Sequence, residues 1–151
     1  MKLLTAAALL ILAASAMGAF EEMEMGIPAM AMGGTGVILS GVQGQFWNPA
    51  SAALMQDTEI SISGKLPYTS MDFTTAGIDG GTRITPNWSL AGAARWFGGE
   101  MYNEQILAVT AAGRLSRDFS VGLQPVISMV NIDDGVSEYG SAMAFSVNAG
   151  I

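Results

Sequence analysis

Residues 87–97 read NWSLAGAARWF, and this stretch decides the fold. Large apolar residues stand at even positions, namely Trp88, Leu90 and Trp96, while the odd positions from 87 to 95 carry small or polar residues such as Ser89 and Arg95. An alternation with a period of two is the signature of a β-strand that has one apolar face. The stretch therefore predicts a strand with bulky side chains on one face and small or polar side chains on the other.

Five other segments show the same alternation, the second of them weakly, and together they predict an all-β chain. Each of the six strands spans about 9–12 residues, which suits a tilted membrane strand of about 9–11 residues better than a globular strand of about 5–6. Alternation alone does not distinguish a face that meets lipid from one that meets a protein core, so strand length favours the membrane. The other segments are residues 58–66, 70–78, 105–115, 119–129 and 141–151.

Connections between these segments fit an up-and-down order of antiparallel strands. Residues 116–118 form a tight turn, and residues 79–86 are expected to form a longer turn at the same end of the sheet. Residues 98–103 and 132–139 are polar and rich in turn formers, so they predict longer loops at the opposite end. Outer-membrane barrels alternate short periplasmic turns with longer outer loops in this way.

Trp88 and Trp96 share a face and lie eight residues apart. At about 3.3 Å per residue the separation is about 26 Å along the strand. A tilt of about 40° leaves about 20 Å along the membrane normal, close to the spacing of the aromatic girdles around an apolar band of about 25 Å. The alternative is a pair of core tryptophans on one strand.

Residues 1–16 have the three parts of a secretory signal peptide. Lys2 gives a positive start, residues 3–14 are apolar, and small residues at Ala14 and Ala16 form a cleavage site. A transmembrane anchor is the alternative, but it needs about 20 apolar residues. We expect an exported protein that is cleaved near Ala16 and located in the outer membrane.

Composition excludes several classes of function. The 151 residues suffice for one domain, and they include no Cys and no His, which rules out disulfides, thiol nucleophiles, Cys or His metal sites and Ser-His-Asp catalysis. Thirteen Asp and Glu against six Lys and Arg leave no basic footprint for nucleic acid. Carboxylate or Lys chemistry remains open, but we expect neither an enzyme nor a cofactor-binding protein.

Two motifs precede the strands: AMGGTGV at residues 31–37 and FWNPA at residues 46–50. Glycines permit positive φ and close approach of the backbone, and they are Gly33, Gly34 and Gly36. Asn48-Pro49, followed by Ala50, favours a turn because Asn can bond its own backbone and Pro fixes φ. We expect a compact irregular segment here.

This pair of motifs resembles the start of the PorV/PorQ-type outer-membrane proteins, within the FadL-like superfamily of long-chain fatty-acid transporter barrels. The resemblance implies an antiparallel up-and-down outer-membrane β-barrel in which a plug-like segment follows the signal peptide. It divides the chain into a signal peptide at 1–16, a plug segment at 17–56 and partial barrel strands at 57–151. Since about eight strands are the minimum for a single-chain barrel, six strands suggest the N-terminal fragment of a longer one.

The resemblance implies a component of a protein secretion pathway, whose partners would be membrane lipid and secretion proteins. A transporter that passes a hydrophobic small-molecule ligand is the alternative, and a soluble periplasmic β-sandwich is a third. A transporter needs a continuous apolar pocket in the lumen, whereas a secretion component needs exposed docking loops. Arg95 and Arg114 lie on the small, polar face, where they would either line the lumen or act as strand-end charges.

Overall fold

The computed structural model describes residue 19 and residues 26–133 and 138–151. The predicted signal peptide at 1–16, with its cleavage site near Ala16, lies outside the described residues, as does most of the start of the plug segment.

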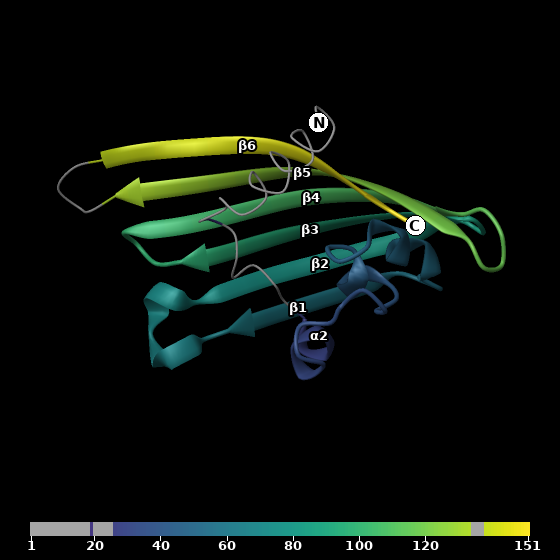
Figure 1. Ribbon diagram of the computed structural model, residues 1–151, viewed down its shortest axis with the longest axis horizontal. Helices are drawn as coiled ribbons and strands as arrows, with labels where there is room; N and C mark the ends of the chain where they lie inside the picture. The colour runs from purple at the N-terminus through teal and green to yellow at the C-terminus, as the bar shows by residue number, and fades with distance from the viewer. Residues whose placement is uncertain (1–18, 20–25, 134–137) are drawn as a thin grey trace, which may run out of the picture.

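Six antiparallel strands form one sheet in chain order, as predicted (Figure 1). Each strand pairs with the next by a simple hairpin connection, and the sheet is open, with β1 and β6 at its two edges. The strands are β1 (Glu59–Lys65), β2 (Thr75–Thr85), β3 (Trp88–Gly98), β4 (Tyr102–Arg114), β5 (Ser120–Asp133) and β6 (Glu138–Gly150).

Short helices occupy the plug segment and the first connection. In the plug segment they are α2 (Ile27–Ala31), η2 (Val42–Gly44) and η3 (Pro49–Leu54), and between β1 and β2 they are η4 (Pro67–Thr69) and η5 (Met71–Phe73). Figure 1 shows η2 and η3 at the end of the sheet that carries the β4–β5 turn. None of the helices in the described part of the chain is long and apolar enough to cross a membrane.

The second strand was predicted at the wrong place. Instead of residues 70–78, β2 covers Thr75–Thr85, and the predicted turn at 79–86 shrinks to residues 86–87. Gly80 and Gly81 stand within the predicted turn, but both lie inside the strand, where Gly81 is closely packed. A Cβ at Gly81 would lie 2.7 Å from Cβ of Ala91 and 2.9 Å from Cε of Met55.

The predicted loops at 98–103 and 132–139 are also shorter than expected. Strand β4 begins at Tyr102 and β5 continues to Asp133, so the connection between β3 and β4 is reduced to residues 99–101. Tyr102 pairs with Ile132 across these strands. Backbone pairing does not require apolar side chains, and so the strands extend beyond the alternating pattern that marked them.

The two faces of the sheet differ in polarity as the alternation predicted. We call the face on which η2 and η3 pack the inward face and the opposite one the outward face. Buried polar side chains occupy the inward face, whereas large exposed apolar side chains occupy the outward face. Inward members include Thr75, Asp79, Ser89, Arg95, Thr110 and Gln124; outward members include Ile60, Ile62, Ile78, Leu90, Leu107, Val109, Leu123, Phe145 and Val147.

Candidate functional site

The candidate site is the interface between the plug segment and the inward face, and it begins at the glycine motif. Gly33 and Gly34 follow the short helix α2 with φ of 71° and 83°, which L side chains rarely adopt. The Gly34 N–H donates to the Ala29 carbonyl at 2.8 Å, so these glycines satisfy the end of the helix. Their role here is to end α2 and redirect the chain toward the sheet.

Gly36 brings the two predicted motifs together. It is buried, and a Cβ at this position would overlap the indole of Trp47. Only a residue without a side chain allows the Trp47 ring to lie on this backbone. The separation of the two motifs in sequence therefore corresponds to a direct contact in space.

Asn48, Pro49 and Ala50 start η3, which packs mainly on β4 and β5 and also touches β6. The Asn48 Oδ1 accepts from the Ala50 N–H at 3.0 Å, and Pro49 occupies the first turn, where no N–H is needed. Asn48 Nδ2 donates to the Ile151 carbonyl at 2.7 Å. On the sheet side, a Cβ at Gly122 would overlap the Pro49 backbone, so this glycine of β5 receives the motif.

Gln45, which sequence reasoning missed, connects the plug segment to several strands of the sheet. Its side chain is fully buried; Nε2 donates to the Gly92 carbonyl at 3.3 Å, and Oε1 accepts from the Thr110 hydroxyl at 2.7 Å. Gln124 Nε2 donates to the Gln45 carbonyl at 3.2 Å and to Thr110 Oγ1 at 2.8 Å. Asn148 Nδ2 continues the network by donating to Gln124 Oε1 at 3.0 Å. One plug residue thus bonds to groups of β3, β4 and β5, and β6 joins through Gln124.

Arg95 lies on the inward face as proposed, but it is sealed rather than open to a lumen. Its Nη2 lies 2.8 Å from Asp79 Oδ1, and both side chains are only 2 % exposed. The guanidinium carbon also lies 4.4 Å from the centre of the Phe46 ring, which comes from the plug segment. Buried charges require partners, and here a carboxylate and an aromatic face provide them. Asp79 was assigned to a turn, so its pairing with Arg95 was not predicted.

Arg114 is not brought together with Arg95. It is half-buried at the last residue of β4, where its N–H donates to the Asn87 carbonyl at 2.8 Å, and it pairs across the sheet with Ser120. Arg95 of β3 pairs with Ile106 of β4, which lies eight residues before Arg114 on that strand. Of the two interpretations of Arg114, the structure favours a strand-end charge.

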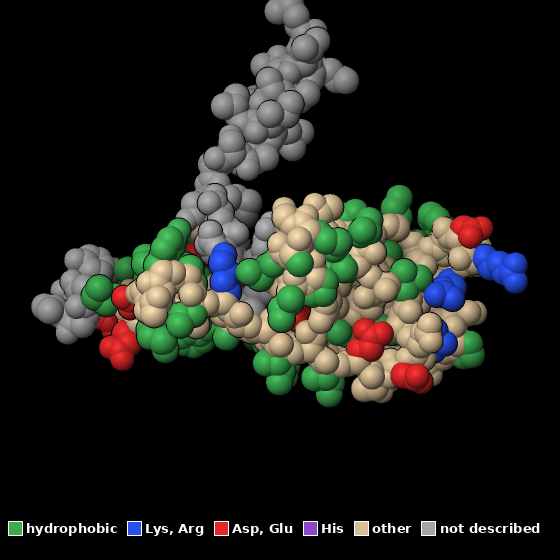
Figure 2. All heavy atoms as spheres, turned by 90° about the horizontal axis from the view of Figure 1, so that it is seen from below, with side chains coloured by type: hydrophobic (Ala, Val, Ile, Leu, Met, Phe, Trp, Pro, Cys, Tyr) green, Lys and Arg blue, Asp and Glu red, His purple; other side chains and the backbone are tan. Residues whose placement is uncertain are grey.

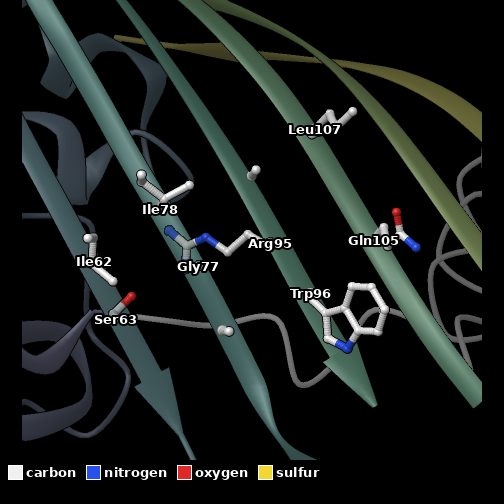
Figure 3. A pocket seen from close by; sticks show the side chains of 10 residues that line it. Ile62, Ser63, Gly77, Ile78, Arg95, Trp96, Gln105 and Leu107 are labelled. Carbon is white, nitrogen blue, oxygen red and sulfur yellow. The ribbon is translucent and has the colours of Figure 1, made fainter. Parts of the chain in front are cut away.

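The outward face carries a shallow apolar hollow of about 360 Å³ between Ile62, Ile78, Trp96 and Leu107 (Figure 3). Figure 3 shows these side chains arising from four neighbouring strands, with Gly77 between them. Both Trp88 and Trp96 are about half exposed on this face, at opposite ends of β3. Nothing among the described residues covers the outward face.

A second hollow, of about 320 Å³, lies at the loop end of the inward face and is rich in aromatic side chains. Lys65, Pro67, Tyr68, Phe73 and Phe97 line it, and the rings of Tyr68 and Phe73 meet edge to face with centroids 6.1 Å apart. Tyr68 has φ of 58°, an uncommon value for a residue other than glycine. This hollow provides an apolar surface beside a Lys side chain.

No group of three or more acidic side chains in the described part of the chain has the geometry to hold a metal ion. Comparison of the chain with protein-family models, with curated proteins and with solved structures finds no match.

Proposed function

We propose that this chain is an outer-membrane protein whose six-stranded sheet forms part of a β-barrel wall, and that it serves as a PorV-like component of a protein secretion pathway. One observation carries the proposal: the plug segment covers the polar face of the sheet, and the apolar face is left exposed. The proposal places the outward face against lipid and the inward face, with the plug segment, toward the lumen.

The exposure of the apolar outward face would be energetically costly in water, and this cost supports a membrane environment. Ile62 is 78 % exposed and Phe145 is 70 % exposed, and both point outward. Each such side chain in water forgoes about 1.5–3 kcal/mol of burial free energy. In a β-sandwich the bulky face would be the covered one, whereas here the covered face holds an ion pair and an amide network. Lipid is the environment that suits this arrangement.

The inward face supports secretion over transport. Its centre is filled by Gln45, Gln124 and the Asp79–Arg95 pair, so the described residues form no continuous apolar path there. The connections at the loop end expose large side chains instead, with Tyr68 90 % exposed. Transport of a hydrophobic small molecule remains the second candidate, and the aromatic hollow around Tyr68 is the observation that favours it.

Cysteine labelling of the full-length protein tests the proposed orientation. Residues 1–151 contain no Cys, so a single replacement at Leu123 or Ser146 introduces the only thiol of this region. Leu123 points outward and should react with a lipid-soluble maleimide only, whereas Ser146 is an inward position by its pairing with Val126 and should escape the lipid-soluble reagent. The protein should also sediment with outer membranes and resist carbonate extraction. Equal labelling of both sites, or recovery in the soluble periplasmic fraction, would refute the proposal.

A further inference from the structure

A hollow of about 850 Å³ lies where the end of β3 meets the connections around it. The large apolar side chains of its lining are Met71 from η5, Trp96 from β3 and Met101 from the β3–β4 turn. Met71 and Met101 are strongly exposed although both are apolar. Methionine is flexible and polarisable, and it is over-represented on surfaces that bind varied partners.

Two carboxylates, Asp72 and Glu100, line the same hollow, and no Lys or Arg does. Both are exposed. The other polar groups of the lining are already bonded within the protein: Trp96 Nε1 donates to the Gly98 carbonyl at 3.2 Å, and Asn103 Oδ1 accepts from Asn131 Nδ2 at 3.0 Å. The charge that the hollow presents to a ligand is therefore negative.

The two ends of the sheet differ in charge, and the hollow lies at the more negative end. Figure 2 shows red carboxylates at both ends of the sheet, whereas most of the blue side chains lie at the right-hand end, away from the hollow. At the hollow's end Asp133 adds to Asp72 and Glu100, and Lys65 is the cation of β1 there. At the other end Arg83 and Arg114 stand together with Asp57 and Asp118, so the carboxylates there are balanced by arginines. A positively charged partner would be attracted to the end that holds the hollow.

We propose that this hollow docks a polypeptide segment of a partner protein in which a bulky apolar side chain is flanked by Lys or Arg. The apolar side chain would enter between Met71 and Met101, and the cation would meet Asp72, Glu100 and the face of Trp96. This inference rests on the proposed secretion role, because it names the kind of partner that such a component would engage at the rim of the barrel wall.

Charge argues against the other occupants of the hollow. Lipid phosphates would meet two carboxylates without a cation in the lining. A second copy of this chain carries a net charge of −7 and would be repelled for the same reason. A basic, amphipathic segment satisfies both the apolar lining and its charge.

The test uses the full-length protein in zwitterionic micelles and a fluorescent synthetic peptide in which two arginines flank two leucines. Anisotropy reports binding, and protein-free micelles provide the blank. We expect Asp72→Asn combined with Glu100→Gln to weaken binding at least about tenfold, because both carboxylates that would meet the arginines lose their charge. Asp57→Asn combined with Asp118→Asn, at the opposite end, is the matched control and should change binding less than about twofold.

Two further peptides identify the source of affinity. A peptide with glutamates in place of arginines should not bind, and one with serines in place of leucines should bind at least about tenfold more weakly. Three outcomes would overturn the docking inference alone. The Asp72, Glu100 variant could bind the arginine peptide as tightly as the unaltered protein, or the glutamate peptide could bind. The third outcome is that protein which passes the Leu123 labelling test does not bind the arginine peptide. A protein that fails the labelling test instead refutes the proposed function, and the docking inference with it.

Discussion

Replacing Asp79 by alanine tests whether the plug segment keeps water away from the inward face. The substitution leaves the Arg95 guanidinium, 2 % exposed, without its counter-charge. Removing one partner of a buried pair costs about 3–5 kcal/mol, whereas removing one partner of a solvated pair costs about 0–1 kcal/mol. Because the pair lies beneath Phe46, we expect the larger loss, about 3 kcal/mol or more.

Urea unfolding of the full-length protein in lipid vesicles, followed by tryptophan fluorescence, measures this loss. Asp57→Ala, an exposed carboxylate, is the control and should change the free energy of unfolding by no more than about 0.5 kcal/mol. Replacing the pair together, as Asp79→Leu with Arg95→Met, should recover most of the loss, since buried pairs exchanged for apolar residues are often neutral.

Two results would refute this reasoning. A loss below about 1 kcal/mol for Asp79→Ala would show that water reaches Arg95, so the plug segment does not seal the face. A double variant as unstable as the single one would show that packing, and not an unpaired charge, causes the loss. The second result would leave the contact between Phe46 and the sheet as the important interaction.

Three further predictions concern the wall and the plug segment. Leu123→Arg should destabilise membrane insertion by about 2–4 kcal/mol if residue 123 lies near the bilayer midplane, whereas Ser146→Arg should have a mild effect. A folding titration into vesicles measures both losses, and equal losses would contradict the assignment of faces. Gly122→Ala should displace η3 and raise the rate of proteolysis within residues 41–56. Gly92→Ala is the control and should leave this rate unchanged, because its Cβ would make only an ordinary van der Waals contact. Unchanged cleavage of the Gly122 variant would argue against close packing of η3 on β5. Asn48→Ala should cost about 0.5–2 kcal/mol in the same urea assay through its lost cap, and no loss would show that the motif is only a linker.

Period-two alternation predicted most of the sheet because each strand has one face of a single polarity. It placed β3 to within one residue, and it assigned Trp88 and Trp96 correctly to the outward face. It failed at β2, where Gly80 and Gly81 interrupt the pattern, and Gly81 does so because it packs closely against β3 and the plug segment. A glycine that makes room for a distant residue has the same appearance in sequence as one that forms a turn.

The candidate site was predictable only in part, since its contacts are distant in sequence. The turn at Asn48 follows from local chemistry, and the inward position of Arg95 follows from alternation. Gln45 has neither signal: it lies in a glycine-rich segment without periodicity, and it bonds to Thr110 and Gln124, which are 65 and 79 residues away. Such a residue is recognised only when the plug segment and the sheet are seen together.

The edges of the sheet add a requirement to the proposal. Strands β1 and β6 each present one unpaired side, and they carry exposed apolar residues such as Ile60 and Met143. In water, long apolar edges of this kind promote aggregation. In lipid, every unpaired backbone group costs several kcal/mol, so an open sheet cannot persist there. The proposed membrane wall is therefore consistent only if further strands pair with both β1 and β6, and the inward polar network on β3–β6 then faces a closed lumen in which the plug segment takes the place of water.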